Sequence, residues 1–171
     1  MIEKIDYSKP YKHTIKKNHE QFLKLGMTSE KSVLEILNEK FGNITKEKYF
    51  YSIFDFCEKN ADGKIIRFFE LKSRNCKIDT FKDLCFGKNK FDKAKQLIAN
   101  NIKVVFIWNL KSKNDPEQRE LYFWEYTKDT PTWEYKFGFI KNTYVAQRKK
   151  EAIFVFTKYL KKLEFLEPVS P

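Results

Sequence analysis

The sequence predicts an α/β protein of the α+β type, with helices flanking a mixed central β-sheet. Three observations lead to this class. Residues 64–74 return after an Asp-Gly turn and form the second strand of an antiparallel hairpin. Residues 103–110, KVVFIWNL, are almost continuously apolar, which is typical of a strand buried on both faces. A segment with helical spacing separates these strands, and this order favours a mixed sheet covered by helices.

Two helices are predicted from the spacing of apolar residues. The first covers about residues 29–41, because Thr28 and Ser29 are good N-caps and Gly42 is a suitable stop. Its apolar positions recur at helical intervals, at Val33, Leu34, Leu37 and Phe41. The second helix is expected over about 88–100, with Phe91, Ala94, Leu97 and Ile98 on one stripe. Each helix therefore has an apolar face that can pack on the sheet.

The remaining elements follow from aromatic runs and turn residues. Residues 49–57 predict the first strand of the hairpin, and Asn60 to Gly63 supply its turn. Residues 120–127 alternate as a strand does, and 133–140 and 152–156 are weaker strand candidates. Thr157 is expected to cap a closing helix whose apolar residues, Tyr159, Leu160 and Leu163, face inward. Trp108, Trp124 and Trp133 are expected in the core.

Length and composition indicate one globular domain with a polyanionic partner. The 171 residues suit a single domain, divided into a basic arm (1–25), a core (about 26–127) and a C-terminal extension (128–171). The formal net charge is +11, which favours nucleic acid as the partner. Nearly all of the positive charge is lysine, which contacts phosphate as a point charge, so backbone binding is favoured over reading of bases.

Several classes are disfavoured by what the sequence contains. The three cysteines form no C-x-x-C pair and the two histidines lie elsewhere, which argues against zinc and a disulfide framework. A reducing intracellular compartment, cytoplasm or nucleus, is therefore expected. The first residues hold no apolar signal segment, and no run approaches the roughly 20 apolar residues that span a bilayer.

One group of charged residues stands out in the hairpin. Side chains alternate across a strand, so Glu70 and Lys72 share a face, and the turn brings Asp55 opposite Glu70. Two carboxylates on adjacent strands can share one hard cation such as Mg²⁺. A lysine beside them can stabilise the charge that develops on a phosphate during hydrolysis. The residues therefore predict a metal-dependent phosphodiesterase site.

The spacing D55-x14-E70-L71-K72 resembles the signature of the PD-(D/E)XK nuclease superfamily, with Phe54 at the proline position. The helix before it is similar to the first helix of Holliday-junction resolvases in that superfamily. The resemblance implies a restriction-endonuclease-like αβββαβ core and Mg²⁺ or Mn²⁺ as cofactor. It implies Asp55, Glu70, the Leu71 backbone carbonyl and Glu30 as metal ligands, with Glu35 as the alternative to Glu30. Lys72 would assist the attacking water, which makes Glu30, Asp55, Glu70 and Lys72 the expected catalytic residues.

Further candidates for nucleic-acid contact lie after the motif. Arg74 shares the face of Glu70 and Lys72, and Lys88 begins the second helix, where backbone N–H groups attract anions. Superfamily members bring a Lys or Gln from this helix to the active site, which nominates Lys90 and Gln96. The Gln-x-x-x-Tyr motif of the RecB-like branch is absent from this sequence, because Asn100 follows Gln96 at that interval.

The function expected from these features is an Mg²⁺-dependent deoxyribonuclease, an endonuclease rather than an exonuclease. RNA is the alternative substrate, and a homodimer is the assembly that small nucleases of this kind often form. The abundance of Lys, Asn, Ile and Phe is typical of A+T-rich genomes and of viral or mobile-element nucleases. The competing hypothesis is a catalytically inactive DNA-binding or scaffold protein with the same fold.

Overall fold

The computed structural model describes residues 30–46, 53–111, 119–141 and 149–169. Its central sheet contains β1 (Ile44–Lys46), β2 (Phe56–Lys59), β3 (Ile65–Arg74), β5 (Lys103–Lys111), β6 (Arg119–Tyr126) and β9 (Lys161–Lys162). A smaller sheet contains β4 (Asp83–Gly87), β7 (Tyr135–Lys141) and β8 (Lys149–Phe156). The helices are one over 30–41 and α2 (Lys88–Ile98), with 3₁₀ turns η1 (Thr132–Glu134), η2 (Thr157–Tyr159) and η3 (Leu163–Phe165).

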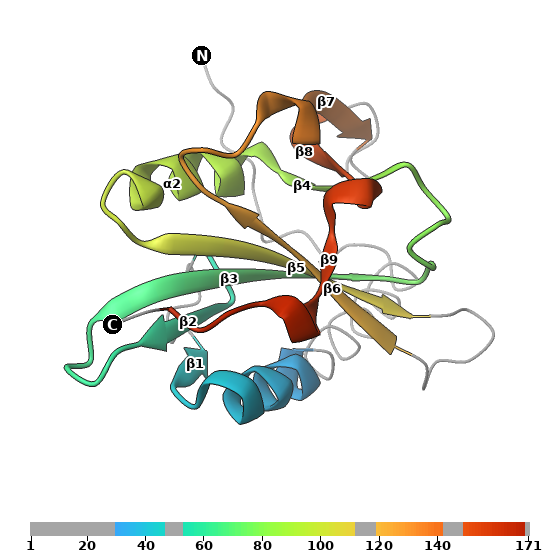
Figure 1. Ribbon diagram of the computed structural model, residues 1–171. Coiled ribbons are helices and arrows are strands. Elements are labelled where there is room, and N and C mark those ends of the chain that lie inside the picture. The colour runs from blue at the N-terminus through green and yellow to red at the C-terminus, as the bar shows by residue number, and fades with distance from the viewer. Residues whose placement is uncertain (1–29, 47–52, 112–118, 142–148, 170–171) are drawn as a thin grey trace, which may run out of the picture.

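The two sheets and two helices form layers. The central sheet has the order β1-β2-β3-β5-β6-β9 and the smaller one the order β4-β8-β7. The helix of residues 30–41 lies on one side of the central sheet, and α2 lies with the smaller sheet on the other (Figure 1). In β3–β5 the strands run parallel, whereas the other neighbours in both sheets are antiparallel. The prediction of a mixed sheet flanked by helices is therefore confirmed.

The hairpin of β2 and β3 forms as its turn residues predict. Gly63 has a φ of +76°, which an L-residue with a side chain rarely adopts. Its N–H donates to the Asn60 carbonyl at 2.9 Å, and the Asn60 side-chain oxygen accepts from the N–H groups of Asp62 and Lys64. These bonds close the turn, and a register shift between Glu58 and Lys59 then places Phe56 opposite Phe69. The register determines which residues meet at the end of β2.

The connection from β3 to β5 gives the sheet its parallel pair. The chain passes through β4 and α2 before β5 pairs with β3 over eight positions, from Arg67 with Lys103 to Arg74 with Leu110. β5 has a run of seven buried residues, from Val104 to Leu110, because helix and sheet layers cover both of its faces. The order is thus helix, three strands, helix, strand, with β4 added before α2.

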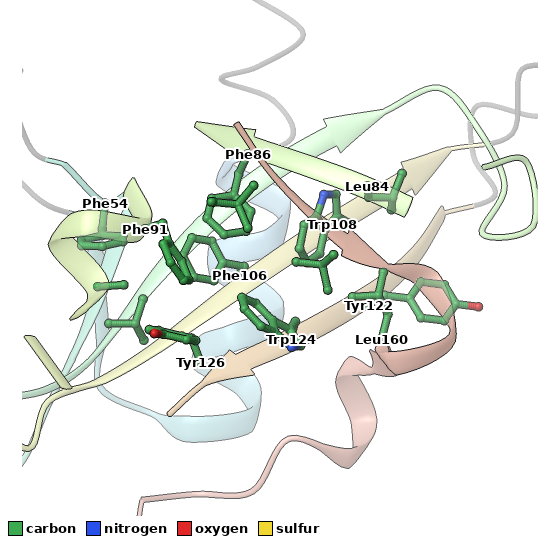
Figure 2. Close-up of a cluster of buried hydrophobic side chains, with 14 of the residues drawn as sticks. Phe54, Leu84, Phe86, Phe91, Phe106, Trp108, Tyr122, Trp124, Tyr126 and Leu160 are labelled. Carbon is green, nitrogen blue, oxygen red and sulfur yellow. The ribbon is translucent and has the colours of Figure 1, made fainter. Parts of the chain in front are cut away.

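Two hydrophobic clusters fill the space on either side of the central sheet. On the face of the helix of residues 30–41, Val33 and Leu37 pack with Phe69 and Leu71. On the opposite face, the smaller sheet and α2 cover a cluster rich in aromatic side chains (Figure 2). There the rings of Phe86 and Phe106 stack with centroids 3.8 Å apart. Burial of such a side chain contributes roughly 1.5–3 kcal/mol.

The strand expected over residues 49–57 is displaced in the structure. β2 begins at Phe56, where the predicted strand ends, and residues 47–52 lie outside the described part. A short strand that the sequence did not reveal, β1, pairs with β2 instead. Within the described residues, Phe54 is buried in a bend that leads into β2, and Phe56 is buried in the strand itself.

The closing helix predicted from Thr157 is wrong. The Thr157 hydroxyl lies 3.2 Å from the carbonyl oxygens of Phe81 and Lys82, which it can reach as a donor, so it ties the chain to the segment before β4. A single 3₁₀ turn follows, and β9 then pairs with β6. Trp133 is 68% exposed and does not belong to the core, in contrast to Trp108 and Trp124.

The C-terminal extension is an integral part of the hydrophobic core. β8 contributes Ile153 and Val155 to the aromatic cluster, and Leu163 and Leu166 fill the cluster on the other face. The core therefore continues well beyond residue 127. No helix in the described part of the chain is long and apolar enough to cross a bilayer.

Candidate functional site

The carboxylate of Asp55 is fixed where β2 begins beside β3. The Asp55 backbone N–H donates to the Phe69 carbonyl at 3.0 Å, which continues the β2–β3 pairing by one residue. Its side-chain Oδ2 accepts the Leu71 backbone N–H at 2.7 Å. A carboxylate that accepts a backbone N–H of the neighbouring strand in this way has little rotational freedom. The predicted meeting of Asp55 with the Glu70 region is therefore present.

Glu70 lies at the centre of the site and is fully buried. Its Oε1 accepts from Lys72 Nζ at 2.5 Å, and its Oε2 lies 2.8 Å from Lys90 Nζ. Lys72 reaches it from the same face of β3, as strand alternation requires. Lys90 reaches it from the first turn of α2, which packs on that face. Both lysines are only partly exposed, so these ion pairs form in a poorly hydrated environment.

Burial raises the pKa of Asp55 to about 6, from an ordinary value of 3.8. The nearby Glu70 carboxylate raises the pKa further, while the Leu71 N–H and the two lysines oppose the shift. A buried group close to a like charge favours its neutral form. Asp55 is therefore a carboxyl whose charged form is disfavoured by burial, although Lys72 and Lys90 lie close to the pair.

This shift predicts that stability depends on pH in metal-free protein. A carboxyl whose pKa is raised on folding stabilises the protein fully below about pH 3.8, and this contribution is lost as pH rises through about 6. We expect Asp55→Asn to remove that loss and to raise the free energy of unfolding at pH 7 by on the order of 2–3 kcal/mol. Urea unfolding across this pH range in EDTA measures it.

The control for this experiment is Asp62→Asn, which changes an exposed carboxylate in the turn. We expect the Asp62 variant to follow the pH profile of the parent. If the Asp55 variant also follows it, the carboxyl of Asp55 is not in the environment described here.

The oxygen atoms at this point suit a hard divalent cation. Asp55 and Glu70 provide carboxylates, and the Leu71 carbonyl lies on the same edge of β3 as its N–H, which bonds to Asp55. Mg²⁺ is usually held by one or two carboxylates and keeps several waters. Within the described ranges no group of three or more His, Cys, Asp or Glu side chains could hold a metal. Water would therefore supply the remaining ligands.

Glu30 does not join this pair. Its carboxylate forms an ion pair with Lys46 of β1, with Nζ 2.5 Å from Oε2. The helix of residues 30–41 packs on the face of β3 that carries Phe69 and Leu71, whereas Glu70 points to the other face. The structure thus places Glu30 apart from Asp55 and Glu70, and its expected part in the metal site, directly or through water, stays a prediction. Glu35 is exposed on the same helix and does not replace it.

The four candidates for nucleic-acid contact have different surroundings. Lys90 belongs to the site because it forms an ion pair with Glu70. Arg74 lines a cleft beside the site. Lys88 instead pairs with Asp92, one turn along α2, at 2.6 Å. Gln96 is exposed near the end of the helix, where its side chain accepts from Lys93 at 3.3 Å. Helical geometry explains the difference: Lys88 and Lys90 both lie in the first turn of α2 but point in nearly opposite directions, and Gln96 lies further along the helix.

Three residues of the cleft, Gly87, Asn89 and Lys150, were not predicted from the sequence. The cleft has a volume of about 300 Å³ and is lined by Lys72, Arg74, Gly87, Asn89, Lys90 and Lys150, together with apolar neighbours. Lys150 belongs to a run of basic residues that resembles a solvated surface in sequence. Only the pairing of β8 with β4, which sets Gly87 opposite Ala152, brings Lys150 close to the start of α2.

No protein-family model, curated protein or solved structure matches this chain. The functional argument is therefore carried by the geometry of the site.

Proposed function

We propose that this protein is a metal-dependent nuclease that hydrolyses phosphodiester bonds of DNA, with Mg²⁺ or Mn²⁺ as cofactor. The observation that carries the proposal is the meeting of two carboxylates and a lysine at one point, where β2 begins. Asp55 accepts from the backbone of β3, while Glu70 is buried against Lys72. A fully buried glutamate beside a carboxyl of raised pKa is typical of functional sites.

Each residue has a distinct role in the proposed reaction. Asp55, Glu70 and the Leu71 carbonyl would hold the cation, which supplies Lewis-acid stabilisation and lowers the pKa of a bound water. Lys72 orients the attacking water and donates to the phosphoryl oxygens as negative charge develops on them. Water adds to phosphorus and loses a proton to solvent, while the bond to the leaving oxygen breaks and that oxygen takes up a proton from solvent. Lys90 holds the Glu70 carboxylate in position from α2.

The rest of the chain supports a nucleic-acid substrate. The surplus of lysine gives long-range attraction to a polyanion. The site lies beside a cleft lined by four basic side chains, with no acidic residue among its described lining. No disulfide joins the three cysteines, which supports an intracellular, reducing location as part of the proposal.

A cleavage assay tests this function. Purified protein is incubated with linear, nicked, forked and four-way DNA and with RNA, in Mg²⁺, in Mn²⁺ and in EDTA. We expect cutting of DNA with either metal and none in EDTA. Asp55→Asn should lower the rate of cutting by about 10²-fold or more, because it removes a metal ligand. It should not destabilise the fold, because the charge that it removes is buried.

Asp62→Asn is the matched control and should cut at the parental rate, because its side chain is exposed in the turn. Cutting that persists in EDTA, or equal cutting by the Asp55 variant, would contradict the assignment.

One observation favours a second candidate function, DNA binding without cleavage. Both oxygens of Glu70 are engaged by lysines, so a cation has to compete with Lys72 and Lys90. A binding protein of this kind would bind DNA in a salt-dependent way and would not bind Mg²⁺ or Mn²⁺. Isothermal titration with Mn²⁺ distinguishes the two functions, because only the nuclease binds the metal in a manner that Asp55→Asn abolishes.

A further inference from the structure

The cleft beside the carboxylate pair is built from both sheets. β3 contributes Lys72 and Arg74, the first turn of α2 contributes Lys90, and β8 of the smaller sheet contributes Lys150. These four basic side chains line one cleft with a volume of about 300 Å³. Charges of one sign in such a hollow raise the local concentration of a ligand of opposite sign. The cleft therefore favours an anion.

A line of charged groups runs along one face of β3 toward this cleft. Glu70, Lys72 and Arg74 are alternate residues, and alternate side chains on a strand are about 6.6 Å apart. The Arg74 guanidinium is positioned by the carbonyls of Ser73, at 2.9 Å, and Cys85, at 3.4 Å. A guanidinium has five N–H groups, so others remain to bind a ligand. Arg74 is thus further from the carboxylate pair than Lys72, by a spacing similar to that between neighbouring phosphates of a nucleic-acid strand.

The start of α2 adds backbone groups to the same hollow. Gly87 is its N-cap and has no side chain, and no acidic residue occupies the first turn of this helix. The first N–H groups of an α-helix have no partner within the helix and attract anions. A Cβ at position 87 would lie 2.6 Å from Asn89 Oδ1 and 3.6 Å from Lys150 Nζ. Glycine therefore keeps the space between these side chains open.

Lys150 is the contribution of the smaller sheet. It lies opposite Ile140 of β7, and both residues line the cleft. Its neighbour Lys149 is absent from the lining, because successive side chains of a strand point to opposite faces. The two lysines thus have equal charge and adjacent positions, but only one of them faces the cleft.

We propose that this cleft is a phosphate subsite, which binds a phosphate of a nucleic-acid strand beside the Asp55–Glu70 pair. The phosphate would be held between Arg74, Lys150 and the N-terminus of α2. The smaller sheet then has a direct part in binding substrate. The inference rests on the proposed function only in taking nucleic acid as the ligand, because the subsite itself requires no metal and no cleavage.

Equilibrium binding to the full chain in EDTA tests the subsite without cleavage. Fluorescence anisotropy is measured with labelled single-stranded and duplex DNA over a range of salt concentrations. We expect Lys150→Ala to weaken binding by about fivefold to tenfold at low salt and to reduce the salt slope by about 1. Arg74→Ala should act in the same direction. Lys149→Ala is the matched control and should change affinity by about twofold or less.

Three DNA ligands identify the source of the phosphate: strands with a 5′-phosphate, strands with a 5′-hydroxyl and closed circles. A Lys150→Ala defect limited to 5′-phosphorylated strands shows a terminal phosphate, and an equal defect on all three shows an internal one. Equal effects of Lys150→Ala and Lys149→Ala overturn the subsite, even if the protein cuts DNA. A defect specific to Lys150→Ala in a protein that never cuts upholds the subsite and overturns the nuclease.

Discussion

Replacing Lys72 by methionine is expected to lower the rate of DNA cleavage by about 10²–10³-fold, with DNA affinity changed by about threefold or less. Lys72 Nζ lies 2.5 Å from Glu70 and is 29% exposed, so its charge acts where water is partly excluded. Methionine keeps an unbranched apolar side chain, one atom shorter than lysine, and removes the ammonium group with its charge and its N–H donors. The loss therefore falls on the transition state, in which negative charge develops on the phosphate.

The stability of this variant should remain close to that of the parent. Lys90 still pairs with Glu70 at 2.8 Å, so the buried carboxylate keeps one partner. Single-turnover cleavage and anisotropy in EDTA separate the chemical step from binding. Lys64→Met, which changes an exposed lysine in the turn, is the control. A Lys72 variant that cuts as fast as the Lys64 variant would refute the role given to Lys72.

The largest expected effect on stability comes from Arg67→Met, which we expect to lower the free energy of unfolding by about 3–5 kcal/mol. Arg67 is fully buried, and its Nε and Nη2 lie 2.7 Å and 2.6 Å from Glu58 Oε2. Its Nη1 also donates to the Glu167 carbonyl at 2.9 Å. Glu58 is 6% exposed, so removal of the guanidinium leaves a buried carboxylate without its charge partner.

A double variant shows whether the loss comes from that stranded charge. Glu58→Met combined with Arg67→Met replaces the pair by apolar groups and should recover much of the stability. Lys95→Met, which removes an exposed partner of Asp92, serves as the control and should change stability by about 0.5 kcal/mol or less. Urea unfolding measures all three. A single Arg67 variant within about 1 kcal/mol of the parent would mean that this pair is not buried as described.

The parts of the fold that the sequence predicts well depend on local signals. Residues 103–110 form a buried strand because seven of them are apolar or compatible with burial. Gly42 ends the helix of residues 30–41 with a φ of +87°. β1 and β4 were missed because three or five residues are too few to show a period. The closing helix failed because the Thr157 hydroxyl bonds to a distant segment rather than to its own turn.

The candidate site shows the same division. Asp55, Glu70 and Lys72 are brought together by one hairpin, so turn chemistry and strand alternation predict the region in which they meet, but the register shift between Glu58 and Lys59 that sets their pairing has no signal in the sequence. The burial of Glu58 has no local signal in the sequence: its partner Arg67 lies opposite it in the same hairpin, but the C-terminal segment that contacts Arg67 is 100 residues away in the chain. Lys150 likewise depends on a strand pairing between positions that are more than sixty residues apart in the chain.

The two lysines at Glu70 have a consequence for how the protein matures. A carboxylate with no exposure usually requires a cation before the surrounding chain can close over it, and many metalloproteins fold only when loaded. Here the chain carries its own counter-ions, Lys72 and Lys90, on elements that pack during folding. The domain can therefore fold without a metal, and in the proposed nuclease metal uptake would be an exchange of one cation for another.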